Sequence, residues 1–188
     1  MVLVPLTALW LPIVLSAIIV FVASSLVHMV LGYHRSDYRK LPDEDKVLSA
    51  LRSVTLTRGL YHFPFCTHKE MKSPEMQEKF KQGPVGFLTI YPAGPVNMGK
   101  FLGQWFVYCL IVGFLTAYLT GRTVPSHSDY LVVFRVAGTV AFMAYGVGHI
   151  INSIWAGQPW SNTFKHVFDG LVYALLTAGT FGWLWPRH

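Results

Sequence analysis

The chain has 188 residues, of which 53% are hydrophobic and only 13% are charged, with a formal net charge of +6. Soluble domains usually carry about 25% charged residues, so this composition excludes an ordinary soluble protein and indicates a membrane protein. The basic excess lies mainly between Arg35 and Lys100, where eleven basic and seven acidic residues occur. We assign it to a surface beside anionic lipid headgroups and not to nucleic-acid binding, because the sequence has no nucleic-acid-binding motif.

Four windows that are nearly free of charge predict four transmembrane helices, at about 6–31, 100–120, 130–154 and 165–185. Each window approaches or reaches the roughly 20 residues that cross a hydrocarbon core of about 30 Å. The predicted fold class is an all-α membrane protein. It forms a four-transmembrane-helix bundle, as a single membrane domain over residues 1–188.

The segment between the first two spans, residues 33–99, carries the basic residues that set the predicted orientation. Arg35 and Arg39 follow the first span closely, Lys100 stands at the start of the second, and no Lys or Arg precedes the first. By the positive-inside rule this segment is cytoplasmic and both termini are periplasmic, in a bacterial inner membrane.

Residues 33–99 are predicted to be a structured cytoplasmic cap. Pro42 followed by three acidic residues is typical of a helix start, which predicts a short helix over about 42–54. Ser73 before Pro74 predicts the start of a second helix, with Gly83 at its end. Aromatic-rich runs at 60–65 and 86–91 favour a two-stranded ribbon.

Polar residues in the last two predicted spans mirror one another about Pro159. Counting outward pairs Asn152 with His166, His149 with Asp169 and Tyr145 with Tyr173, and each set of three falls on one face of a helix. An ionisable group in a membrane span is costly and therefore informative. The predicted topology adds His28 at the same depth, near the cytoplasmic face. The predicted polar cluster consists of His28, Tyr145, His149, Asn152, His166, Asp169 and Tyr173.

Three interpretations of this cluster remain open. It is structural if His149 simply donates a hydrogen bond to Asp169. It is a metal or haem site if His28, His149, His166 and Asp169 supply ligands to zinc, copper or iron. It belongs to a small proton-coupled transporter or channel if the His149–Asp169 pair relays protons.

The last forty residues resemble an uncharacterised bacterial family of small four-span integral membrane proteins, a domain of unknown function. The resemblance lies in Ile151 to Gly157, Phe168-Asp169-Gly170 and Ala178 to Trp183, and more loosely in Leu31-Gly32-Tyr33. It implies the four-span architecture. It implies no chemistry, and it does not extend to His149 or His166.

The sequence contains no recognised catalytic motif, so we assign no catalytic residue and expect a non-enzymatic protein. Gly99-x-x-x-Gly103 and Gly113-x-x-x-Ala117 have the spacing of close helix contacts in membranes. We therefore expect a self-assembling or accessory membrane subunit, with the lipid bilayer and a homo-oligomer or larger membrane complex as its partners. The metal or haem protein and the small transporter are the alternatives.

Overall fold

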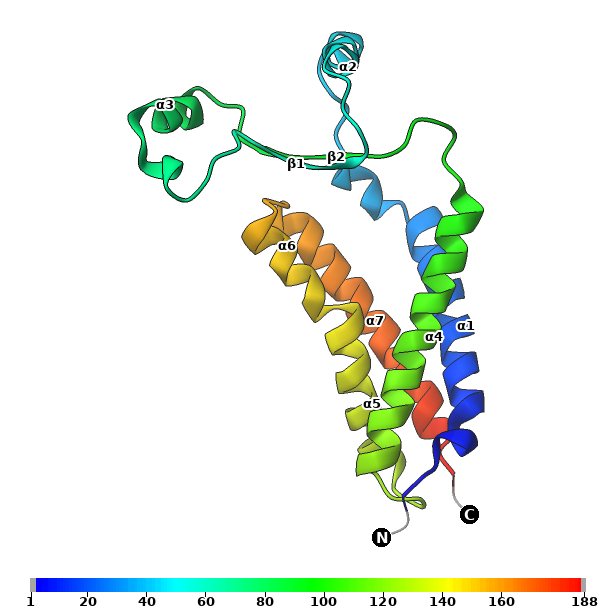
Figure 1. Cartoon of the computed structure of the whole chain (residues 1–188). Helices are drawn as coiled ribbons and strands as arrows, with labels where there is room; N and C mark the ends of the chain where they lie inside the picture. The colour runs from blue at the N-terminus through cyan, green and yellow to red at the C-terminus, as the bar shows by residue number, and fades with distance from the viewer. Residues whose placement is uncertain (1–2, 187–188) are drawn as a thin grey trace. The chain divides into compact units, whose positions relative to one another are not determined.

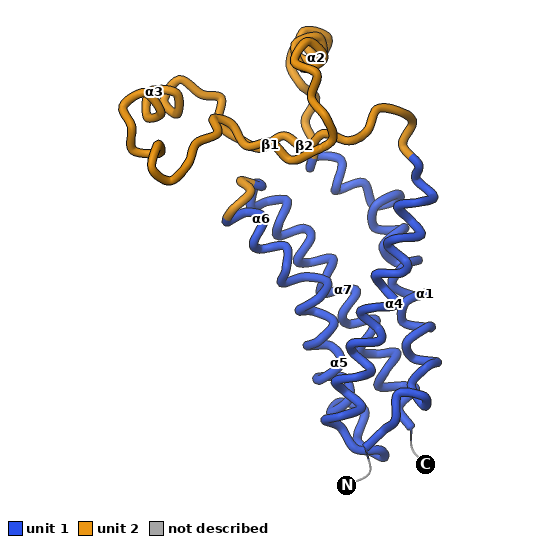
Figure 2. Tube along the Cα trace, in the orientation of Figure 1, with its two compact units in different colours: residues 1–37, 97–154, 158–188 blue, residues 38–96, 155–157 orange. Residues whose placement is uncertain are grey.

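The computed structural model describes residues 3–186, which are mostly helical and divide into two compact units (Figure 2). Unit 1 contains the described residues up to Asp37, Asn97–Ile154, and the described residues from Gln158 onward. Unit 2 contains Tyr38–Val96 and Trp155–Gly157. The predicted cap, 33–99, therefore covers the long segment of unit 2, but its first residues, Tyr33–Asp37, belong to unit 1.

Unit 1 is built from long apolar helices, listed here in chain order. They are η1 (Leu6–Leu9) with α1 (Trp10–Met29), α4 (Met98–Thr123), α5 (Tyr130–Tyr145), η4 (Val147–His149) with α6 (Ile150–Trp155), and α7 (Trp160–Trp183). Three segments are long and apolar enough to cross a membrane: Leu6–Met29, Met98–Thr123 and Tyr130–Trp155. Among the described residues α7 does not reach the same hydropathy, because its first half carries Asn162, Lys165, His166 and Asp169.

The helices of unit 1 pack in an antiparallel arrangement. The N–H of Val4, before α1, donates to the carbonyl of Gly121 near the end of α4 over 3.2 Å. At the other end of the same helix pair, Trp105 Nε1 donates to Ser24 Oγ over 2.8 Å. Packing of α5 against α7 completes the unit (Figure 1), so α1 and α5 run in one direction and α4 and α7 in the other.

Small residues permit these close helix contacts. A methyl group added at Gly113 would lie 3.1 Å from the carbonyl oxygen of Ile13, and one added at Gly170 would lie 2.6 Å from the backbone nitrogen of Gly146. Within residues 3–186, nothing lies within 4 Å of a methyl group added at Gly103. The predicted seam at Gly113 therefore lies inside unit 1, whereas the described part of the chain leaves Gly103 unpacked.

The predicted third span, 130–154, is interrupted at Gly146. There the α-helix gives way to the 3-10 turn Val147–His149, and α6 follows it. A 3-10 turn has 3.0 residues per turn where an α-helix has 3.6, so it rotates the following side chains around the axis. The mirror pairing about Pro159 assumed one unbroken α-helix and loses its register at this point.

Unit 2 confirms the short helices and the ribbon predicted between the first two spans. Helix α2 is Glu44–Ser53, η3 is Glu70–Lys72 and α3 is Pro74–Gln82, while β1 (Gly59–Phe63) pairs antiparallel with β2 (Gly86–Ile90), Tyr61 opposite Leu88. Ser73 is the N-cap of α3, since its side chain accepts a hydrogen bond from the Met76 N–H over 3.2 Å.

Candidate functional site

A sharp turn after α1 brings polar side chains against α7. Gly32 has a φ of 66°, a left-handed conformation that glycine adopts without steric cost. The following 3-10 helix η2 (Tyr33–Asp37) lies in unit 1 and contacts α7. This turn places Tyr33, His34 and Asp37 beside the polar first half of α7.

His34 lies between two carboxylates. Its Nε2 is 2.7 Å from Asp169 Oδ2 and its Nδ1 is 2.5 Å from Asp37 Oδ2. The other oxygen of Asp169 accepts a hydrogen bond from the Tyr33 hydroxyl. The side chains are 12% exposed for His34, 6% for Asp37 and 4% for Asp169, so the chain of contacts is largely shielded from the surroundings.

Lys165 contacts Asp37, the carboxylate on the other side of His34 from Asp169. Its ammonium group donates to Asp37 Oδ1 over 2.6 Å, to the Tyr33 carbonyl over 2.9 Å and to Ser36 Oγ over 2.8 Å. Asn162 Nδ2 donates to the Asp37 carbonyl over 3.0 Å. Side chains of α7 therefore hold η2 in place from both sides.

The electrostatics favour an ionised Asp37 carboxylate and a neutral Tyr33 hydroxyl. Burial opposes ionisation of Asp37, but the hydrogen bonds and positive charges of Lys165 and His34 outweigh it and hold its pKa below the usual value. Burial raises the pKa of Tyr33, and its hydrogen bond to Asp169 raises it further. The Tyr33 hydroxyl is therefore a hydrogen-bond donor at neutral pH. The two carboxyl groups differ in their partners: Lys165 neutralises Asp37, whereas Asp169 has no lysine or arginine partner in residues 3–186.

Four imidazole rings gather around Asp169. The His34 ring centroid is 4.4 Å from that of His28 and 5.2 Å from that of His166, and His166 stacks on His149 at 4.9 Å. Ligand atoms of His28, His34 and Asp169 all lie within 4.8 Å of one another, and so do those of His34, Asp37 and His166. Imidazole and carboxylate oxygen are donors that suit zinc, iron and copper.

A cavity of about 680 Å³ opens beside these rings. Its polar wall includes His28, His149, His166, Asp169 and Tyr173. Its apolar lining comes from the last residue of α1, Met29, and from the beginning of α4. The cavity lies entirely within unit 1.

The structure brings six of the seven predicted cluster residues to this one cavity: His28, Tyr145, His149, His166, Asp169 and Tyr173. Asn152 does not line it; its backbone carbonyl accepts a hydrogen bond from the Gln158 N–H. In the structure Tyr33 and His34 contact the Asp169 carboxylate, and the His149 ring stacks on that of His166.

Sequence reasoning missed Tyr33, His34, Asp37 and Lys165, because the first three follow the last apolar residue of α1 and were assigned to the cap. One signal could have found them. His34-x-x-Asp37 has the same spacing as His166-x-x-Asp169, and each motif is preceded by a residue that binds the other motif's carboxylate: Tyr33 binds Asp169 and Lys165 binds Asp37.

No family model matches the chain, and the comparisons found no similar curated protein and no similar solved structure. The resemblance of residues 151–186 to a family of small four-span membrane proteins therefore stays a prediction.

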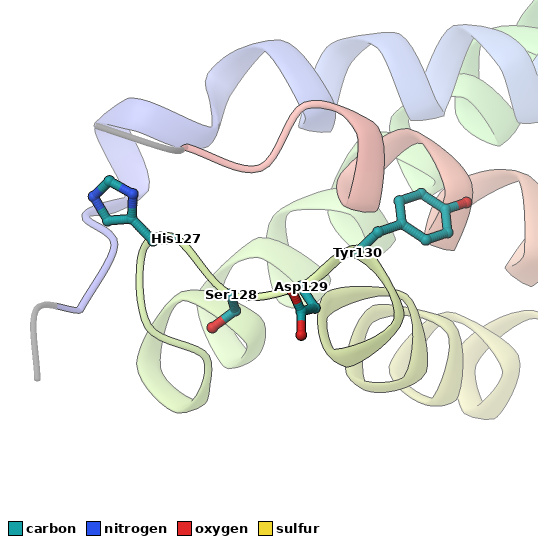
Figure 3. Close-up of a pocket in the computed structure, with 4 residues that line it drawn as sticks. All are labelled: His127, Ser128, Asp129 and Tyr130. Atoms are coloured by element: carbon teal, nitrogen blue, oxygen red, sulfur yellow. The ribbon is translucent and has the colours of Figure 1, made fainter.

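A smaller hollow of about 230 Å³ lies at the turn between α4 and α5, lined by His127, Ser128, Asp129 and Tyr130 (Figure 3). The His127 ring points away from the side chains of Ser128 and Asp129. In the described part of the chain, no group of three metal-ligating side chains forms here. This hollow offers a matched control position for tests of the histidine cluster.

Proposed function

We propose that this chain is an integral membrane protein that binds a divalent transition-metal ion between α1, η2 and α7. The observation that carries the proposal is the convergence of His28, His34 and Asp169, whose ligand atoms lie within 4.8 Å of one another. These three donors come from separate segments of the chain. A membrane span rarely holds so many ionisable side chains together without a functional reason.

The distribution of charge favours this triad over the second group, His34, Asp37 and His166. Asp37 is neutralised by the Lys165 ammonium group at 2.6 Å, whereas the side-chain contacts of Asp169 in the described part of the chain come from the imidazole of His34 and the hydroxyl of Tyr33. A divalent cation would supply the missing positive charge at Asp169. Asp37 would then be the outer carboxylate that is commonly found behind a metal-bound histidine, because its Oδ2 lies beside Nδ1 of His34.

Three protein ligands leave a coordination position open, which is the arrangement of metal sites that bind a further ligand. Sites that are purely structural are usually closed by four protein ligands. The cavity of about 680 Å³ adjoins His28 and Asp169, so an outside molecule has room to reach that position.

A metal ion fits this site better than haem does. Haem carries two anionic propionates, which need basic partners, and among residues 3–186 no lysine or arginine lines the cavity. Among the described residues, Asp169 is the only acidic side chain in its wall, and a carboxylate repels anions and attracts cations.

We further propose that α7 crosses the membrane as the fourth span of the bundle, in a bacterial inner membrane. Its 24 residues are long enough, and it packs along α5 and α1, which are themselves candidate spans. The basic residues of 33–99 then place that segment in the cytoplasm, with both termini periplasmic. Labelling of single cysteines at Gln158 and Pro186, which flank α7, tests this, because labelling of both from the same side would contradict it.

The expectation of a self-assembling or accessory subunit stays a prediction and does not conflict with a metal site. A second copy could pack at Gly103, where the described residues leave the helix surface free. Light scattering of the purified protein and of a Gly103→Ile variant tests this expectation, since a monomer in both preparations would contradict it.

Elemental analysis of protein purified without chelators tests the metal site. We expect one transition-metal ion per chain in the native protein, and loss of that ion in His34→Ala and Asp169→Asn. The matched control is His127→Ala, an exposed histidine in the turn between α4 and α5, which should keep the metal. Circular dichroism shows that the variants are folded. A folded native protein that binds no zinc, iron or copper on titration would refute the proposal.

A further inference from the structure

The cavity next to the histidines has two chemically different walls. The apolar wall consists of Met29, Met98, Phe101, Leu102 and Trp105, which come from the last turn of α1 and the first two turns of α4. The polar side chains of the lining lie on α5, η4 and α7 and also on α1, which contributes Ser24, Ser25 and His28. A site of this kind suits an amphipathic molecule, since each part of the molecule meets a wall of its own polarity.

The apolar wall continues onto the outer surface of unit 1. Met29 is 76% exposed, Met98 is 60% exposed and Phe101 is 47% exposed. Helices α1 and α4 are both candidate membrane spans. The cavity therefore opens sideways toward lipid chains, and a molecule dissolved in the membrane can enter it with its apolar part against these residues.

Tyr173 supplies an unsatisfied polar group at the polar wall. The residue is 4% exposed, and in the described part of the chain its hydroxyl has no hydrogen-bond partner. A buried hydroxyl without a partner costs about 1–3 kcal/mol, a cost that a ligand oxygen in hydrogen-bonding contact would remove. Helix α7, which carries Tyr173, is fixed in this position by packing, since Gly170 lies directly against Gly146.

The charge of the lining selects among amphipathic molecules. Among residues 3–186, no lysine or arginine lines the cavity, and Asp169 is part of its wall. A phosphate or carboxylate head would be taken out of water beside a carboxylate, which is unfavourable. A neutral head with a hydroxyl or carbonyl oxygen meets Tyr173 and the imidazoles of His149 and His166 instead.

We infer that this cavity binds a membrane-dissolved amphiphile with one apolar chain and an uncharged oxygen-bearing head, the head lying against Tyr173. The volume of about 680 Å³ is within the roughly 300–1,000 Å³ of typical ligand sites. This inference goes beyond the proposed metal site and concerns the chain without the ion, because a cation bound at Asp169 would favour an anionic head over a neutral one. The labelling described below is therefore done on protein treated with EDTA, after its metal content has been measured.

The test uses the full chain in phosphatidylcholine nanodiscs, which avoids detergents that are themselves neutral amphiphiles. A photoreactive long-chain alcohol is added and irradiated, and the labelled residues are mapped by mass spectrometry. We expect labelling to concentrate at Phe101, Leu102 and Trp105. Excess hexadecanol should compete with the probe, and palmitate at pH 8 should not.

Three variants make the test specific. Leu102→Trp fills the cavity and should lower labelling about tenfold, because overpacked sites reject additional groups. Leu115→Trp, on the same helix but outside the cavity and 50% exposed, should leave labelling unchanged. Tyr173→Phe removes only the hydroxyl and should lower labelling about threefold to tenfold.

Two results would overturn the inference. One is labelling spread evenly over outward residues such as Ile111 and Phe114 with no effect of Leu102→Trp. The other is competition by palmitate equal to that by hexadecanol, which would exclude a neutral head. Metal content of the same Leu102→Trp protein is measured in parallel, and unchanged loading shows that a failure here leaves the metal site standing.

Discussion

The contact between Lys165 and Asp37 fixes η2 against α7, and its removal should destabilise unit 1 measurably. In Lys165→Met the side chain keeps a similar length but loses its charge. Three hydrogen bonds disappear, to the Asp37 carboxylate, the Tyr33 carbonyl and the Ser36 hydroxyl. The Asp37 carboxylate, which is only 6% exposed, then keeps only His34 as a side-chain partner among the described residues.

The magnitude follows from the burial of the two partners. Breaking a fully buried ion pair costs about 3–5 kcal/mol, while an exposed pair contributes about 0–1 kcal/mol. Lys165 is 24% exposed and Asp37 is nearly covered, so the pair stands closer to the buried case. Because His34 remains beside Asp37, we expect Lys165→Met to lower the free energy of unfolding by about 2–3 kcal/mol.

A double-mutant cycle with Asp37→Asn separates this pair from its surroundings. If the two charges act on each other, Lys165→Met should cost much less in the Asp37→Asn background than in the native one. The matched control is Lys46→Met, which breaks a pair with Asp43 whose side chains are 83% and 73% exposed. That variant should cost less than about 1 kcal/mol.

The assay is equilibrium unfolding in mixed micelles of dodecyl maltoside and sodium dodecyl sulfate, followed by circular dichroism. Equal effects of Lys165→Met and Lys46→Met, or full additivity in the cycle, would refute the reasoning. Either result would mean that the contact between Lys165 and Asp37 contributes no more to the free energy of unfolding than an ordinary surface ion pair does.

The remaining predictions concern the metal, the pH and helix packing. Asp37→Asn should weaken zinc affinity about 10–100-fold without removing a ligand, as measured by competition with a fluorescent chelator. The stability difference between native protein and Lys165→Met should shrink as the pH falls below the ordinary value of 3.8, because the pKa of Asp37 is lowered in the folded protein and protonation removes the ion pair. Gly170→Ala should lower the free energy of unfolding by about 1–3 kcal/mol through its clash with Gly146, whereas Gly103→Ala should be neutral or stabilising.

The local structure of unit 2 was predictable because its signals are local. An acidic first turn after Pro42, the Ser73-Pro74 start and two aromatic runs each depend on a few neighbouring residues. The structure has α2, α3 and the β1–β2 ribbon at those places. The spans were predictable to the same extent: three of the four windows correspond to helices apolar enough to cross a membrane.

The site was only partly predictable, because it depends on a turn and on a helix break. The spacing of His149, His166 and Asp169 indicated a polar face, and the predicted topology added His28 at the same depth. The direction of the chain after Gly32 follows from a single backbone angle, which hydropathy does not encode. Without that turn, His34 and Asp37 read as loop residues, and the contact between His34 and Asp169 was not predicted.

The position of His34 between two carboxylates has a thermodynamic consequence for any ion that binds there. A neutral imidazole has one N–H, so it can donate to Asp169 or to Asp37 but not to both. Both contacts become hydrogen bonds only when the ring carries two protons. A ring that carries both protons must lose the one on Nε2 before a cation can coordinate there, and uptake of the ion by such a ring is accompanied by release of a proton to the solvent. Calorimetric titrations in buffers of different ionisation enthalpy would record that exchange as a buffer-dependent heat.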